Sequence, residues 1–183
     1  MKKIFAILAM AISTVAAADS VSLETRKVQG INSPDATVYR MAYKHDFSKS
    51  LAGDVVIGQT QTDNTAMSIT TRIESGMAYS APLVGSVKGY VRGAVGERFS
   101  TKGNTSYWVV EPGVTMPIGP FNTRVGYRYR SSFDPETNGD QTHTARVSAS
   151  YALTKQDAVG MRFDRQRGDS NQNIVGLFYT RSF

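Results

Sequence analysis

Arginine is the residue type whose spacing in this sequence most clearly suggests a chemical use. Between positions 121 and 133, Arg124, Arg128 and Arg130 fall on one parity, and Tyr127 and Tyr129 fall on the other. Alternate residues of a β-strand point to the same face, so the three guanidinium groups are predicted to share one face. A guanidinium binds a carboxylate or a phosphate through two parallel hydrogen bonds. The pattern therefore predicts a surface that attracts anions.

The same arrangement recurs along the chain. The polar parity of the predicted strands carries these basic residues: Arg40, Arg72, Lys88, Arg92, Arg98, Arg124, Arg128, Arg130, Arg146 and Arg162. The acids on that parity are fewer: Asp46 and, as the expected lumen acids, Glu74, Glu111 and Asp164. If water fills the space between these side chains, the surplus of bases favours anions, as rings of arginine do in anion pores. If the side chains close the space, they must be ion-paired, because an unpaired buried charge is costly.

The register of antiparallel hairpins predicts which charges meet. The expected pairs are Glu74 with Lys88, Glu111 with Arg124 or Arg128, and Arg146 with Asp164. A register slip of two residues keeps every side chain on its face but changes its partner. The sequence thus determines the face of these charges better than their pairing.

The opposite parity of the same segments is apolar and aromatic. Val159, Met161 and Phe163, for example, alternate with Gly160 and Arg162. A soluble β domain buries its apolar face and shows its polar face to water. Here the polar face carries the arginines, so we expect the inverse pattern of a transmembrane barrel, with apolar residues toward lipid and polar residues inside.

The segments predict an all-β fold, a transmembrane antiparallel up-and-down β-barrel. We expect about ten strands, with eight or twelve as alternatives, short loops, and both termini in the periplasm. One short connection is predicted around Ala81–Pro82. The facing of the strand at 54–62 stays open, because Val55, Val56 and Ile57 place apolar side chains on both parities.

The N-terminus has the features of a secretory signal peptide. Lys2 and Lys3 precede the apolar run 4–12, and small residues at 16–18 provide a cleavage site before Asp19. We expect residues 1–18 to be removed and residues 19–183 to form one barrel domain. No later apolar run approaches the ~20 residues of a membrane-spanning helix. A closed barrel is then the remaining way to cross a bilayer with every backbone group paired.

Aromatic residues collect near the predicted strand ends. The expected girdles at the two membrane interfaces contain Tyr39, Phe47, Tyr79, Phe99, Trp108, Phe121, Tyr129, Tyr151 and Phe183. Aromatic residues favour strands in general, but that preference does not explain why they gather at ends that agree with one topology. Outer-membrane lipid and lipopolysaccharide are the expected surroundings.

Other kinds of site have little support in the sequence. The 183 residues carry a formal net charge of +6, two histidines and no cysteine, which excludes disulfides and thiolate metal sites. His45 and His143 are predicted at opposite ends of the barrel, and no metal, cofactor or catalytic group is expected. A nucleic-acid partner is not expected, because the arginines point inward. Arg167–Asp169 reads R-G-D, which resembles an integrin-binding motif but is better explained as a turn.

Two resemblances narrow the class. The last strand, 173–183, ends on Phe183 after alternating apolar residues and resembles the C-terminal strand of Gram-negative outer-membrane proteins. The resemblance implies that Phe183 is an assembly signal read by the barrel-assembly machinery. Residues 111–113 and 124–130 resemble the monomeric acidic-oligosaccharide porins, specific for oligogalacturonate or sialate. That family has about twelve strands, and this chain is short for that number.

These features predict a porin-like channel of the outer membrane. Its arginine-rich lumen is expected to favour small anionic solutes, and the protein is not expected to be an enzyme. The alternative is a non-conducting barrel, structural or adhesive, with an ion-paired core. The surplus of bases over acids favours the channel, since water can solvate an excess of charge that a closed core cannot.

Overall fold

A computed structural model describes residues 20–31, 34–62, 68–101, 103–134 and 141–183. The predicted signal peptide, 1–18, lies outside these ranges. The described residues form ten strands: β1 (Ser20–Gly30), β2 (Ala36–Asp46), β3 (Leu51–Thr62), β4 (Ile69–Val84), β5 (Val87–Ser100), β6 (Gly103–Ile118), β7 (Phe121–Ser132), β8 (Thr142–Ala152), β9 (Asp157–Gly168) and β10 (Gln172–Ser182). None of the described segments is a helix long and apolar enough to span a membrane.

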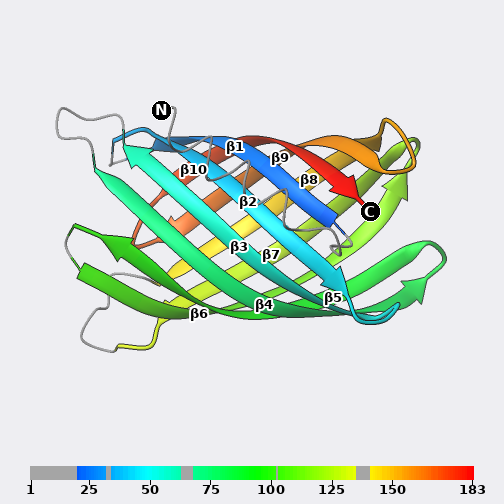
Figure 1. Cartoon of the computed structure of the whole chain (residues 1–183), viewed down its shortest axis with the longest axis horizontal. Coiled ribbons are helices and arrows are strands. Elements are labelled where there is room, and N and C mark those ends of the chain that lie inside the picture. The colour runs from blue at the N-terminus through cyan, green and yellow to red at the C-terminus, as the bar shows by residue number, and fades with distance from the viewer. Residues whose placement is uncertain (1–19, 32–33, 63–67, 102, 135–140) are drawn as a thin grey trace.

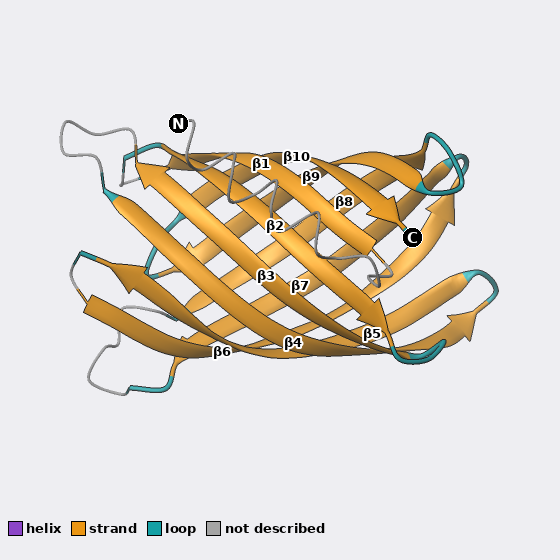
Figure 2. Ribbon diagram, in the orientation of Figure 1, coloured by secondary structure: helices purple, strands orange, loops and turns teal. Residues whose placement is uncertain are grey.

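The ten strands close into one barrel. Each strand pairs antiparallel with its neighbours in sequence, and β1 pairs with β10 to complete the ring. Figures 1 and 2 show the strands running obliquely around the barrel axis, as closure of a sheet requires. The predicted up-and-down barrel of about ten strands is confirmed.

The two ends of the barrel differ in their connections. Ser20 pairs with Ser182, so the first and last described strands begin and finish at the same end. We call it the terminal end; it also holds the turns β2–β3, β4–β5, β6–β7 and β8–β9. The other end, called the loop end, holds the remaining five connections and lies at the left of Figure 1.

One predicted turn was misplaced. β4 runs past Ala81 and Pro82 to Val84, and the turn lies at 85–86. Proline lacks the N–H that a sheet requires, but here it sits beside a register irregularity near the strand's end, where a missing donor is tolerated. The left-handed φ of 56° at Gly85 supplies the actual reversal, since glycine alone adopts it without strain.

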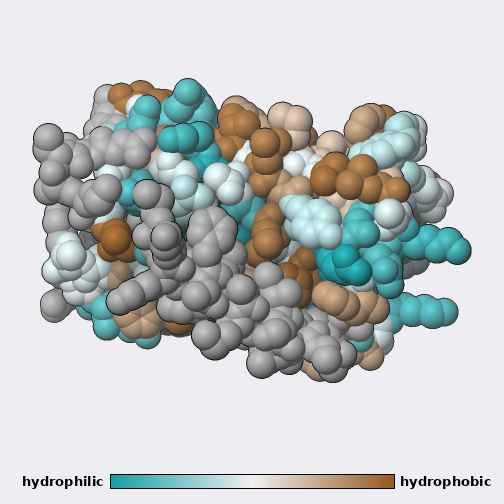
Figure 3. Space-filling model, turned by 45° about the horizontal axis from the view of Figure 1, so that its top comes forward, coloured by the Kyte–Doolittle hydropathy of each residue, from teal (hydrophilic) through white to brown (hydrophobic). Residues whose placement is uncertain are grey.

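Exposure alternates along the strands with the predicted parity. On β9, Met161 and Phe163 are 59% and 49% exposed, whereas Asp164 is completely buried. On β3, Val55 and Ile57 are exposed and Val56 is buried, which settles the facing that the sequence left open. Figure 3 shows hydrophobic side chains across the visible middle of the wall and hydrophilic ones toward both ends. The outer wall is therefore apolar and the interior polar.

Three inward aromatic rings lie against glycines on neighbouring strands. A Cβ on Gly160 would lie 2.3 Å from the Phe178 ring, and one on Gly113 would lie 2.4 Å from the Tyr90 hydroxyl. Tyr107, which is 1% exposed, would likewise clash with a side chain at position 96. Glycine at these places lets a large ring lie flat on the inner wall, which leaves the centre of the barrel to the charged side chains.

Candidate functional site

A connected set of ion pairs crosses the barrel interior. We call it the mid-barrel network, and it contains Glu24, Arg26, Arg40, Asp54, Glu74, Arg92, Glu111, Arg124, Arg128, Arg146, Arg162 and Asp164. These residues come from every strand except β10. On β10, Gly176 faces the network, and a Cβ there would lie 3.0 Å from Glu24 Oε1.

Glu24 organises one side of the network. Its Oε2 accepts hydrogen bonds from Arg26 at 2.6 Å, Arg40 at 3.3 Å and Arg162 at 3.1 Å. Arg26 also lies 3.7 Å from Asp164, whose carboxylate is completely buried. One carboxylate on β1 thus holds guanidinium groups from three strands.

Glu74 and Glu111 organise the other side. Glu74 accepts hydrogen bonds from Arg92 at 2.7 Å and Arg128 at 2.5 Å. Arg128 also lies 3.8 Å from Glu111, which is bound in turn by Arg146 at 2.7 Å. Both carboxylates are 4% exposed. Each acid is therefore shared by several arginines within a space that excludes most water.

Two of the three predicted ion pairs occur. Arg146 lies 3.3 Å from Asp164, and Arg124 lies 3.1 Å from Glu111. The pairing of Glu74 with Lys88 was wrong. Because the β4–β5 turn lies further along the chain than expected, Lys88 is opposite Pro82 at the terminal end, where it is exposed.

Sequence reasoning missed three members of the network. Glu24 and Arg26 lie on β1, where the alternation is too weak to indicate a face. Asp54 lies on β3 and binds Arg92 at 2.8 Å; its face was ambiguous for the reason given above. Parity places Asp54 on the face of Val56 and Glu24 on the face of Arg26, but it does not say which face of either strand points inward. With these residues included, the network holds seven arginines and five acids, so most of its charge is compensated.

Aromatic rings support several of the predicted arginines. The guanidinium of Arg124 lies 3.8 Å from the centre of the Tyr90 ring, and that of Arg130 lies 5.3 Å from the Tyr107 ring. Both distances fall within the range of cation–π attraction. Arg98, above them toward the loop end, donates to Thr105 at 3.1 Å. These contacts fix long side chains that would otherwise be free to sample many rotamers.

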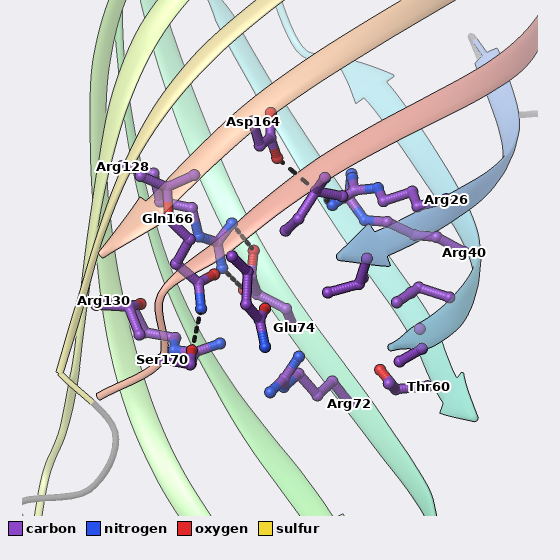
Figure 4. A pocket seen from close by; sticks show the side chains of 18 of the residues that line it. Arg26, Arg40, Thr60, Arg72, Glu74, Arg128, Arg130, Asp164, Gln166 and Ser170 are labelled. Carbon is purple, nitrogen blue, oxygen red and sulfur yellow. Dashed lines mark hydrogen bonds and ion pairs between the residues drawn. The ribbon is translucent and has the colours of Figure 1, made fainter. Parts of the chain in front are cut away.

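A cavity of about 290 Å³ lies between the network and the loop end. It extends from Pro34, Thr62 and Ser170 at the strand ends to Glu74 and Asp164 in the network. Its charged lining consists of Arg26, Arg40, Arg72, Arg128, Arg130, Arg146, Glu74 and Asp164. Figure 4 shows Arg72 and Arg130 within this space and, above them in this view, the contact of Arg128 with Glu74. The lining thus holds six arginines and two acids, and four of the arginines, Arg26, Arg40, Arg128 and Arg146, also pair with Glu24 or Glu111 just outside it.

The residues predicted for the aromatic girdles lie on the outer wall near the strand ends. Those at the terminal end are largely exposed, at 60% for Phe47, 58% for Tyr79 and 58% for Phe183. Toward the loop end, Trp108 packs on Tyr129 with ring centres 5.2 Å apart. At the terminal end, the rings of Phe121 on β7 and Tyr151 on β8 also pack together, with their centres 5.9 Å apart. Tyr39 on β2 and Phe99 on β5 lie toward the loop end.

The other candidates do not form a site. His45 packs against Phe47 at the terminal end, whereas His143 contacts Tyr127 at the loop end. Within the described ranges, no group of three or more histidines and acids could hold a metal ion. Asp169 of the R-G-D tripeptide accepts a hydrogen bond from the backbone N–H of Gln141. That contact gives the Gly-Asp sequence a structural role in the β9–β10 connection.

Solved structures of outer-membrane porins superpose on this barrel. The NanC porin superposes with a TM-score of 0.61 over 89% of this chain and 100% of its own, at 9% identity. The KdgM porin in complex with disordered oligogalacturonate gives 0.52 over 90% and 99%, at 8% identity. The chain has the fold of a small outer-membrane porin.

A third solved structure has a similar fold. An outer membrane channel from Pseudomonas putida F1 gives a TM-score of 0.55 over 92% of this chain and 97% of its own, at 9% identity. No protein-family model and no curated protein sequence matches the chain. At these identities the likeness concerns the barrel, so the function has to be argued from the interior side chains.

Proposed function

We propose that this protein is an outer-membrane channel of porin type that favours small anionic solutes. Both termini face the periplasm, and the loop end faces outward. The observation that carries the proposal is the cavity at the loop end, where six arginines and two acids surround about 290 Å³. Charge of one sign within a low-dielectric wall focuses the electric field and raises the local concentration of the opposite ion.

The mid-barrel network is the constriction of this channel. A small anion that reaches it meets guanidinium groups whose hydrogen-bond directions are only partly filled by carboxylates. Arg40 and Arg162 share one oxygen of Glu24, for example. A solute carboxylate or phosphate can take the place of such a shared acid, since a guanidinium offers five donors. Transport then proceeds by exchange of partners along the arginines, which permits passage of anions at a low rate and excludes cations.

A second candidate is a non-conducting barrel with a structural or adhesive role. The specific observation in its favour is the burial of the network: the side chains of Glu74, Arg92 and Arg128 are 6%, 7% and 11% exposed. An interior packed to that extent can close the barrel completely. Eight-stranded barrels have just enough space for their side chains, and ten strands add only a little.

Planar-bilayer recording distinguishes the two candidates. The refolded wild type is expected to give small single-channel current steps. In a salt gradient, its reversal potential should have the sign expected of an anion-selective channel. Replacing both Arg72 and Arg130 with Ser removes two charges from the cavity lining and should shift that potential toward cations. Lys155→Ser, in the exposed β8–β9 turn, is the matched control and should leave it unchanged. An absence of steps in the wild type would favour the non-conducting barrel.

A further inference from the structure

The cavity at the loop end has two unlike walls. Apolar side chains line it from β10, β1, β2 and β3, which are consecutive in the barrel. We call them the apolar wall: Val28, Ala36, Val38, Val56 and Ile174. Val38 is half-buried, and the other four are 4–8% exposed. Inward side chains of a water-filled barrel are normally polar, so a group of aliphatic side chains inside this one requires a physical reason.

The strand register makes the apolar wall continuous. Val28 on β1 is directly opposite Ile174 on β10 and Ala36 on β2, so these three form one row across three strands. Val38, the next inward position on β2, packs against that row. Val56 lies deeper in the barrel, opposite Glu74. The aliphatic side chains therefore form a single surface that faces the cavity.

The other wall supplies hydrogen-bond donors. On β7 and β8, Arg130 is opposite Thr142 and Arg128 is opposite Thr144, and all four line the cavity. β7 lies diametrically opposite β2, five strands away in either direction around the ring. Figure 4 shows Arg130 and Thr60, which belong to β7 and β3, on opposite sides of the space. Guanidinium and hydroxyl groups both donate to a carboxylate.

The size of the cavity limits its occupant. A dry cavity of ~150 Å³ lined by aliphatic and aromatic side chains holds one benzene molecule, and this cavity measures about 290 Å³. Part of the space exists because Gly58, between Arg40 and Arg72 in the register, has no side chain. A Cβ at position 58 would meet only a backbone oxygen, at 3.9 Å.

We propose that the cavity binds a monocarboxylate whose apolar body has about six to eight carbon atoms. The carboxylate lies at Arg130 and Thr142, and the apolar body lies on the apolar wall. Arg130 is one inward position nearer the loop end than Arg128, which binds Glu74, so the two carboxylates are kept apart. This inference rests on the proposed function, because it names the class of anion that the cavity accepts.

Calorimetric titration of the refolded chain in detergent tests the proposal. The probes are acetate, butanoate, hexanoate and gluconate, of which gluconate has six carbons but a hydrophilic body. Each CH₂ group that leaves water for an apolar surface adds up to about fourfold in affinity. Hexanoate should therefore bind at least about tenfold more tightly than acetate, and gluconate should bind no more tightly than acetate.

The titration separates this proposal from the channel function. Equal affinity for hexanoate and gluconate, or no binding by any probe, would overturn the proposal, whereas anion-selective current would still support the channel. Selective binding of hexanoate by a chain that gives no current would support the site and refute the channel. The two readouts are independent, because binding in detergent requires no passage through the barrel.

Two variants locate the bound tail. Gly58→Leu places a side chain in the cavity and should weaken hexanoate binding at least about tenfold. Gly93→Leu is the matched control and should bind hexanoate as the wild type does, because Gly93 is exposed on the outer wall and its Cβ would meet nothing within 4 Å. Val38→Thr keeps the shape of the apolar wall but adds a hydroxyl group.

The Val38→Thr variant should weaken hexanoate about fivefold and leave acetate unchanged, a difference that a purely structural role of Val38 would not produce. If Gly58→Leu fails to refold, Val38→Thr provides the test by itself. Unchanged hexanoate affinity in Val38→Thr, or an equal loss in Gly93→Leu and Gly58→Leu, would refute the proposal.

Discussion

Most carboxylates of the mid-barrel network each contact two or three arginines, so acids and arginines are expected to contribute unequally to the stability of the barrel. Replacing one carboxylate of the mid-barrel network should destabilise the barrel more than replacing one of its peripheral guanidinium groups. Glu74→Gln is the test of the acid, because Gln keeps the size of the side chain and removes its charge. Arg124→Gln is the test of the base.

The magnitudes come from burial and from the partners that remain. Without the Glu74 charge, Arg92 still has Asp54 at 2.8 Å, whereas the remaining acid partner of Arg128 among the described residues is Glu111, at 3.8 Å. Removing one partner of a buried ion pair costs ~3–5 kcal/mol, and the partial compensation places Glu74→Gln near the lower limit, at ~3 kcal/mol. The side chain of Arg124 is 41% exposed, and Glu111 keeps Arg146. Arg124→Gln should thus cost ~0–1 kcal/mol, as exposed pairs do.

Urea unfolding of the chain in liposomes measures both changes. Trp108 is the only tryptophan of the sequence and reports the transition by its fluorescence. The difference between the two variants in the free energy of unfolding is expected to be ~2 kcal/mol or more. If both variants lie within ~1 kcal/mol of the wild type, the carboxylates are hydrated. The interpretation of the network as a desolvated constriction would then be wrong.

Two further predictions concern packing and assembly. Gly160→Ala should destabilise the barrel by ~1–3 kcal/mol, because its Cβ would overlap the Phe178 ring; Gly93→Ala, whose Cβ meets nothing within 4 Å, should be neutral or slightly stabilising in the same unfolding assay. Deleting Phe183, which is 58% exposed, should reduce the heat-modifiable folded form in cell membranes while leaving refolding in detergent nearly unchanged, and normal assembly of the truncated chain would exclude its role as a signal.

The sequence by itself determined the class of fold. Strict alternation, as in Val159–Asp164, places apolar and charged side chains on opposite faces whatever the neighbouring strands do, because the period of a strand is a local property. Closure into a barrel follows, since backbone groups facing lipid must all be paired. The parity of Arg124, Arg128 and Arg130 was fixed in the same local way.

The partners of those arginines were decided only by the tertiary structure. Glu74 binds Arg128, which is 54 positions away in the chain, across the centre of the barrel, and no hairpin register brings these two strands together. The shift of one turn from Ala81–Pro82 to Gly85–Ser86 was enough to separate Glu74 from Lys88. The contributions of Glu24 and Asp54 depended on strands whose faces became defined only when the ring closed. Sequence determined that Arg124, Arg128 and Arg130 point inward, but barrel closure determined which acids they meet and how nearly the charges neutralise one another, because that depends on distances across the lumen.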